Sequence, residues 1–166
     1  YWKIEFRYLS TSNCHLLLAV SGGLDSIVLT DLVAKAGFNF SIAHCNFKLR
    51  GAESERDEQF VTELASKYNK EIFIQKFDTV SYAENNKISI QVAARELRYN
   101  WFQELMNSKL HTLNYKLLTA HHADDNIETV LMNFFRGTGI KGLHGILPNQ
   151  NYILRPLLFA QRTDIE

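Results

Sequence analysis

Short apolar segments alternate with longer amphipathic ones along most of the chain. The short segments are continuous apolar runs, which is typical of buried strands. They cover residues 15–20, 38–47, 71–77 and 115–122. The longer segments repeat apolar residues with the period of an α-helix. They begin at Asp25, near residue 52, near residue 89 and near Ala123.

The order of these segments predicts a fold class. Strands that alternate with helices favour a parallel sheet covered by helices on both faces. The helix over residues 89–107 is expected to turn its apolar residues toward the core, and these are Ile90, Ala94, Leu97, Trp101 and Leu105. The last predicted helix carries the apolar residues Ile127, Val130, Leu131 and Phe134. Residues 152–158 form one more candidate strand. We expect one doubly wound, Rossmann-like α/β domain over residues 1–166.

Polar residues gather where the predicted strands end. The first strand runs into SGGLDS, the second ends in HCNFKLR, and the fourth ends in HHADD. In open α/β sheets, ligands bind outside the carboxyl ends of the strands, near a switch in strand order. We therefore expect the functional site to be formed by these three segments.

Composition limits the classes of partner and the cellular compartment expected for this domain. Lysine and arginine together number 18, as do aspartate and glutamate, so no net charge marks the chain as a nucleic-acid or membrane protein. A local basic patch can still exist at zero net charge. The two cysteines, Cys14 and Cys45, form no CxxC pair and indicate a reducing compartment, which we expect to be the cytoplasm. The apolar runs are shorter than the roughly 20 residues of a membrane-spanning helix, so we expect no membrane partner.

The segment SGGLDS, residues 21–26, has the features of an anion cradle between a strand and a helix. Gly22 and Gly23 allow positive φ and close backbone approach, and the helix N-terminus attracts negative charge. Ser21 and Ser26 add hydroxyl donors. Asp25 would repel a phosphate, unless it binds Mg²⁺ that bridges to the phosphates. The alternative reading is a helix N-cap without a ligand.

Two familiar nucleotide motifs are excluded. A Walker A loop needs a lysine after its glycines, and Leu24 and Asp25 follow Gly23 here. One literal GxGxxG match exists at residues 137–142, but it follows a helical run rather than a strand. We therefore reject it as a dinucleotide-binding motif.

SGGxDS after a first strand resembles the PP-loop of the N-type ATP pyrophosphatases. The ordered set of LLLAVSGGLDSIVLTDLV, AHCNFKLRGAESERDEQFV, SIQVAARELRYNWF, TAHHADDNIETVLMNFFRGTGIKGL and ILRPLL is similar to the tRNA(Ile)-lysidine synthetases, from about residue 15 to 158. The resemblance implies ATP and Mg²⁺ as cofactors and free L-lysine and tRNA(Ile) with a CAU anticodon as partners. The family adenylates the C2 oxygen of the wobble cytidine and replaces AMP with the amine of lysine. The resemblance also implies that the chain is a fragment without the family's C-terminal tRNA-binding region, and it leaves a homodimer open.

The resemblance also implies roles for individual residues. ATP binding falls to the loop and to the end of the second strand, that is to Ser21, Gly22, Gly23, Leu24, Asp25, Ser26 and His44. The catalytic candidates are Asp25, Arg95, Arg98, His121 and Asp125. Asp25 is expected to bind Mg²⁺, and Asp125 and Asp124 to bind lysine. The motif leaves open which arginine reaches the α-phosphate, and Asp124 is also a candidate helix N-cap. Lys48, Arg50, Arg136 and Arg155 are basic candidates for contact with RNA.

Three other functions compete with this one. A tRNA thiolase of the same superfamily would typically carry CxxC pairs and a lysine inside the PP-loop, which this chain lacks. A small-molecule synthetase would share the loop but not the HHADDNIET and RGTG segments. A non-catalytic ATP-binding module would not need Asp25, the HHADD segment and the arginines together. A zinc site at His121, His122 and Asp124 is disfavoured, because it lacks the HExxH spacing and a cysteine ligand.

Overall fold

The computed structural model describes residues 14–108, 114–139 and 143–166. Its first strands and helices are β1 (Cys14–Ala19), α2 (Leu24–Lys35), β2 (Phe40–Asn46), α3 (Ala52–Lys67), β3 (Ile72–Lys76), α4 (Thr79–Asn86) and α5 (Ile90–Ser108). They are followed by β4 (Asn114–Leu118), α6 (Ala123–Phe135), β5 (Asn149–Gln150), β6 (Ile153–Leu154) and α7 (Arg162–Ile165). The expected alternation of strands and helices is confirmed.

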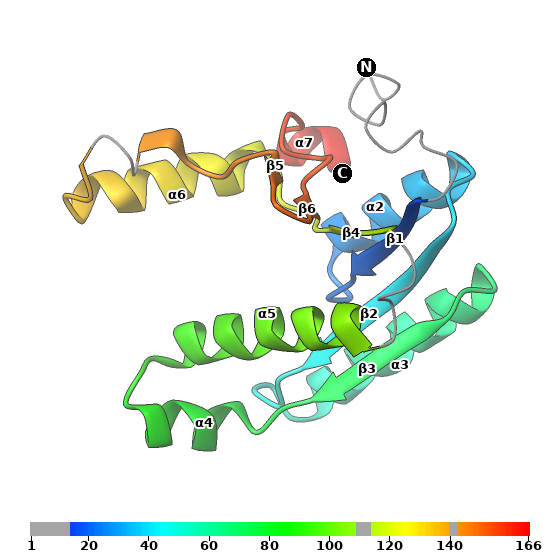
Figure 1. The fold of residues 1–166 in the computed structure, drawn as a ribbon, viewed down its shortest axis with the longest axis horizontal. Helices are drawn as coiled ribbons and strands as arrows, with labels where there is room; N and C mark the ends of the chain where they lie inside the picture. Colours follow the sequence, from blue (N-terminus) through cyan, green and yellow to red (C-terminus); the bar gives the residue numbers. More distant parts are fainter. Residues whose placement is uncertain (1–13, 109–113, 140–142) are drawn as a thin grey trace.

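One six-stranded sheet organises these elements, in the order β3-β2-β1-β4-β6-β5 (Figure 1). All neighbouring strands are parallel except the β5–β6 pair, which is an antiparallel hairpin at the edge. The chain moves outward from β1 to β3 and then returns to place β4 on the other side of β1. The switch in strand order therefore falls between β1 and β4, where a doubly wound sheet binds its ligands.

Two hydrophobic clusters cover the two faces of the sheet. On one face, α2, α3 and α7 pack against Leu16, Leu18 and Ile42. On the other face, Phe102 and Leu105 of α5 pack against Leu17 and neighbouring strand residues. Leu16, Leu17 and Leu18 of β1 are all 0% exposed, because a central parallel strand is covered on both sides. The expected doubly wound α/β fold is therefore confirmed.

Three details differ from the sequence prediction. The strand expected over residues 115–122 ends at Leu118, so Thr119 to His122 are irregular. Helix α4 was not predicted; it is only eight residues long and begins after Asp78, whose carboxylate accepts a hydrogen bond from the Ser81 amide. On α5, the predictions that Leu105 and Trp101 face the core are confirmed, but the other fully buried residues of the helix are Ala93 and Phe102, so its buried face is rotated from the predicted one. Aromatic residues on both predicted faces of α5 obscured its orientation.

Helix α6 forms as predicted, but its apolar residues do not enter the core. None of its residues is buried, and Figure 1 shows the helix projecting away from the sheet. Its exposed apolar side chains are Ile127 (56%), Leu131 (49%), Met132 (50%), Phe134 (65%) and Phe135 (82%). Among the described residues, no helix combines the length and apolar character needed to cross a membrane.

This exposure leads to a stability prediction. Replacing Phe135 with aspartate is expected to change the free energy of unfolding by less than about 0.5 kcal/mol, as is usual for surface substitutions. Leu17→Ala, at a fully buried position, is expected to cost about 2–5 kcal/mol. Urea denaturation of the two variants measures both effects. A loss above about 2 kcal/mol for Phe135→Asp would show that this side chain is covered in solution.

Candidate active site

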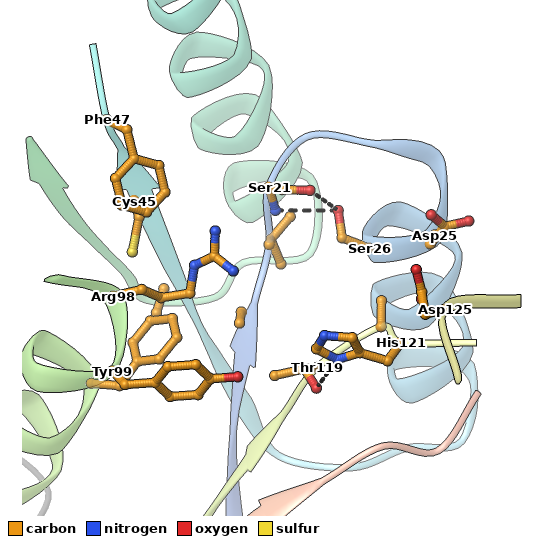
Figure 2. A pocket seen from close by; sticks show the side chains of 15 residues that line it. Ser21, Asp25, Ser26, Cys45, Phe47, Arg98, Tyr99, Thr119, His121 and Asp125 are labelled. Atoms are coloured by element: carbon orange, nitrogen blue, oxygen red, sulfur yellow. Dashed lines mark hydrogen bonds between the residues drawn. The ribbon is translucent and has the colours of Figure 1, made fainter. Parts of the chain in front are cut away.

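A cavity of about 190 Å³ lies at the carboxyl ends of β1, β2 and β4, next to α5 (Figure 2). Its polar lining includes Ser21 from the loop after β1, Asp25 and Ser26 from the first turn of α2, Arg98 from α5, and His121 and Asp125 from the segment after β4. The remaining lining is largely apolar and aromatic. Residues more than 100 positions apart therefore face one cavity, as the strand-end argument predicted.

The loop after β1 is held by its own serine hydroxyls. Ser26 Oγ donates to the Gly23 carbonyl at 2.8 Å and accepts a weaker bond from the Ser21 amide at 3.3 Å. Gly22 has φ +92°, and a Cβ there would lie 3.3 Å from Cβ of Asp57. Glycine suits this position because the backbone angle lies where other residues are strained, and a Cβ would in addition press on the Asp57 side chain.

Helix α2 begins at Leu24, with Gly23 as its N-cap residue. Of the two glycines that allow positive φ, Gly22 adopts it, whereas Gly23 has φ −78°. The N-cap alternative for Asp25 is also wrong. Both Asp25 and Ser26 lie in the first turn of the helix, where amide groups favour an anion.

Asp25 is bound to an arginine that the sequence did not suggest. Both carboxylate oxygens of Asp25 accept from Nη1 of Arg162 at 2.9 Å. The Arg162 amide donates to Oδ2 of Asp124 at 2.8 Å, and Nε of Arg162 donates to Glu166 at 3.0 Å. Arg162 therefore joins the first turn of α2 to the first turn of α6.

Helix α6 begins at the cavity with His122 as its N-cap residue. The carboxylate of Asp125 accepts from the His122 amide at 2.9 Å, so Asp125 caps the helix and also lines the cavity. The alternative reading of Asp124 as the N-cap residue is wrong. The buried His122 ring lies 3.6 Å from carboxylate oxygens of both Asp124 and Asp125 and 3.9 Å from Asp25. Three carboxylates thus surround one imidazole.

His121 faces the cavity, and its Nδ1 shares a hydrogen bond of 2.9 Å with the Thr119 hydroxyl (Figure 2). Burial lowers the pKa of His121 below its ordinary value of 6.5. The positive charge of Arg155 lowers this pKa further, while Asp125 opposes the shift. His121 is therefore neutral at physiological pH, which is the form that accepts a proton.

The lowered pKa predicts how stability depends on pH. Below about pH 6.5 the unfolded chain protonates this histidine while the folded chain resists, so acidification destabilises the fold. His121→Gln removes this contribution, and its free energy of unfolding should fall less than that of the unsubstituted chain between pH 7.5 and 5.5. Urea midpoints at both pH values measure the difference. His15, whose pKa is also lowered by burial, contributes equally in both proteins. An equal fall in both would contradict the prediction.

The structure separates the two candidate arginines of α5. Arg98 is half-buried, lines the cavity, and has its guanidinium 5.2 Å from the centre of the Phe47 ring. Figure 2 shows its side chain directed toward the loop after β1. Arg95 is exposed, does not line the cavity, and lies against Tyr99 at 5.3 Å. The geometry therefore favours Arg98 for contact with a bound phosphate.

The end of β2 contributes backbone and packing rather than charge. His44 is buried, and its Nδ1 is 2.8 Å from the Val20 carbonyl oxygen. It lines a smaller adjoining cavity of about 80 Å³ together with Cys45 and Ser21, which also line the main one. Burial raises the pKa of the Cys45 thiol to about 12, so it remains protonated. Cys45 thus lacks the thiolate that nucleophilic chemistry requires.

Two of the basic candidates for RNA contact are already engaged. Arg155 is 6% exposed, and its Nη1 donates to the Leu147 carbonyl, so it is not available on the surface. Arg50 pairs with Asp57 at 2.8 Å beside the loop.

The GxGxxG match begins at Gly137, one residue beyond the C-cap of α6, which supports its rejection as a cofactor motif. Its residues 140–142 lie outside the described part of the chain.

The family profile of the PP-loop domain matches residues 3–166. The chain belongs to the PP-loop family. The SGGLDS segment, which resembles a PP-loop in sequence, lies at the carboxyl end of β1.

Curated relatives show which members of the PP-loop family this chain is similar to. It is 48% identical over 162 residues to tRNA(Ile)-lysidine synthase of Bacteroides thetaiotaomicron, covering 98% of the chain and 37% of that relative. It is 44% identical to tRNA(Ile)-lysidine synthase of Chlorobaculum tepidum, covering 90% of the chain and 46% of that relative. The predicted resemblance to the tRNA(Ile)-lysidine synthetases is confirmed. The chain spans only about a third to a half of the length of these relatives.

Solved structures confirm the PP-loop fold. The U34-tRNA thiolase NcsA from Methanococcus maripaludis superposes with a TM-score of 0.76 at 18% identity, covering 99% of this chain and 58% of that one. The NH3-dependent NAD synthetase from Campylobacter jejuni gives a TM-score of 0.61 at 14% identity, covering 98% and 65%. At these identities the likeness concerns the fold alone.

Proposed function

We propose that this chain catalyses the ATP-dependent joining of free L-lysine to the wobble cytidine of tRNA(Ile) with a CAU anticodon. One observation carries the proposal: the PP-loop, Arg98, His121 and Asp125 line a single cavity. The similarity to tRNA(Ile)-lysidine synthases supplies the substrates. An intracellular reaction on tRNA agrees with our expectation of a cytoplasmic protein.

In the first step, the C2 oxygen of cytidine attacks the α-phosphorus of ATP, and the bond to the β-phosphate oxygen breaks. Negative charge develops on the α-phosphate and on the departing pyrophosphate. The PP-loop amides and the hydroxyls of Ser21 and Ser26 would bind the pyrophosphate, and Arg98 would stabilise charge on the α-phosphate. Fixed cations and amide dipoles are effective here because they need no rearrangement during the reaction.

The protein side chains at this site are too few to hold a magnesium ion alone, so the ion fits only if the nucleotide supplies further ligands. Within the described ranges, no group of three or more His, Cys, Asp or Glu side chains is placed to hold a metal. Asp25, however, already binds the guanidinium of Arg162, so its position suits a cation. Asp25 would hold Mg²⁺ that is also bound to the triphosphate, and the ion would neutralise phosphate charge.

In the second step, the lysine amine attacks C2, the bond from C2 to the adenylated oxygen breaks, and AMP leaves. The lysine ammonium must first lose a proton. Asp125 and Asp124 would bind the ammonium, and neutral His121 would accept its proton. With Nδ1 donating to Thr119, the lone pair of Nε2 would act as the base.

A thiolase reaction is the main alternative, because NcsA shares this fold. That structure carries a [4Fe-4S] cluster, and such clusters are held by cysteine thiolates. This chain has two cysteines, and burial raises the pKa of both Cys14 and Cys45. These cysteines do not provide a cluster site, which favours the ligase.

The test is a product analysis. The chain is incubated with ATP, Mg²⁺, labelled lysine and tRNA(Ile) transcript bearing a CAU anticodon. We expect label in the RNA together with AMP and pyrophosphate, and no label when the wobble base is uridine. Formation of ADP instead of AMP would contradict the proposed reaction.

The homodimer stays a prediction. Light scattering of the same sample tests it.

A further inference from the structure

The Asp25–Arg162 pair places a positive group where the proposed reaction needs a metal ion. Nη1 of Arg162 lies 2.9 Å from both oxygens of Asp25, so a single guanidinium nitrogen spans the carboxylate. Residues 25 and 162 are 137 positions apart, so the contact depends on the folded site.

The surroundings of this pair are strongly acidic. Arg162 also contacts Glu166 through Nε, and its amide binds Asp124. The His122 ring between Asp25, Asp124 and Asp125 approaches them only to 3.6–3.9 Å. Arg162 therefore supplies the closest positive charge to Asp25 among the described residues. Without it, the PP-loop would hold an unneutralised carboxylate when no nucleotide is bound.

The pair is also accessible enough to exchange. The side chain of Arg162 is 44% exposed and that of Asp25 is 26% exposed. Ion pairs this close to solvent contribute little net free energy, because water and salt screen them. An incoming divalent cation can therefore compete for the same carboxylate.

We propose that Arg162 is a positioning residue of the ATP site, which occupies the cation position on Asp25 in the nucleotide-free protein and yields it to Mg²⁺ bound to the triphosphate. The inference rests on the proposed function. While Arg162 is bound, it holds Asp25 beside Asp124 and lowers repulsion within the acidic cluster. Once released, its guanidinium is free to face the phosphates, whose charge it complements.

The experiment measures how binding of an ATP analogue depends on Mg²⁺. The probe is α,β-methylene-ATP, whose α–β linkage is not cleaved, and calorimetry follows its binding as Mg²⁺ is varied. Arg162→Gln removes the competing charge, so we expect the Mg²⁺ concentration for half-maximal binding to fall by about two- to fivefold, the range set by partly exposed ion pairs. Arg162→Lys keeps the charge and should stay within about twofold of the unsubstituted chain. Lys35→Gln removes an exposed charge from the far end of α2 and should change nothing.

A second comparison isolates the carboxylate. In an Asp25→Asn background, Arg162→Gln should no longer alter the Mg²⁺ requirement, since the group for which the two cations compete is absent. A purely structural role for Arg162 would lower the melting temperature without changing the Mg²⁺ requirement.

The outcomes are distinguishable. An unchanged or increased Mg²⁺ requirement in Arg162→Gln, with analogue binding intact, would overturn this inference alone. The same fall in the Asp25→Asn background would also overturn it. Absence of Mg²⁺-dependent binding in the unsubstituted chain would overturn the proposed ATP site and this inference together.

Discussion

Arg98→Ala is expected to slow the formation of AMP and pyrophosphate by about 10²–10³-fold, the loss that follows removal of one group aimed at developing charge. Arg98 lines the cavity from α5 and points toward the PP-loop. Aromatic side chains line the cavity beside Arg98, so no other positive group in the described lining takes over its charge. Single-turnover measurement of pyrophosphate release, at saturating ATP and tRNA, reports the effect on this adenylation step.

Arg95→Ala is the matched control for this prediction. Arg95 lies on the same helix, three residues earlier, but is exposed and contacts Tyr99 outside the cavity lining. We expect its removal to cost less than about fivefold, in line with a screened surface charge. If Arg95→Ala were the slower variant, the assignment of the α-phosphate to Arg98 would be wrong.

The second large effect is expected at His121. His121→Gln should leave adenylation of the tRNA close to that of the unsubstituted chain, while lysine transfer slows by at least about 10²-fold, the lower range for loss of a general base. Adenylated tRNA should therefore accumulate, and chromatography of nuclease digests separates it from lysidine. Since burial lowers the pKa of His121, the transfer rate should decline only below about pH 6.5.

The exposed His144 provides the control for this variant. His144→Gln should alter neither step, because this side chain lies outside the cavity lining. Equal slowing of adenylation and transfer by His121→Gln would mean that the residue supports the architecture of the cavity rather than proton transfer. A transfer rate that falls already above pH 7 would contradict the lowered pKa.

The sequence was sufficient for the framework of the fold. The apolar runs that became β1, β2 and β3 were recognised within one or two residues of their ends, because a strand buried on both faces leaves a continuous apolar signal. The end of β4 was placed too late, since Thr119 and Ala120 are compatible with both strand and loop. Because ligands bind at the carboxyl ends of the strands in open α/β sheets, the sequence alone predicted that the PP-loop and the HHADD segment form one site.

Contacts between elements that are distant in the sequence could not be predicted. Periodicity identified α6 as amphipathic, but it does not tell whether a partner covers the apolar face, and in this structure none of the helix is buried. Arg162 lies in a short segment without a motif, and its contact with Asp25 joins residues that are 137 positions apart in the sequence. Tyr99 lines the cavity through the rotation of α5, and Thr119 through the early end of β4, which no spacing in the sequence specifies.

The parallel arrangement of β2, β1 and β4 also has an evolutionary consequence. Apart from Arg98, Tyr99 and Phe102 of α5, the residues that face the cavity lie in or shortly after strands that are hydrogen-bonded to a neighbouring strand on both sides. Their placement is therefore inherited from the most rigid part of the molecule. The outward surfaces of α3, α4 and α6 can accumulate substitutions, and their connecting loops can change length, without displacing these groups. The outer helices of the domain thus tolerate substitution, while the central strands keep the cavity residues in position.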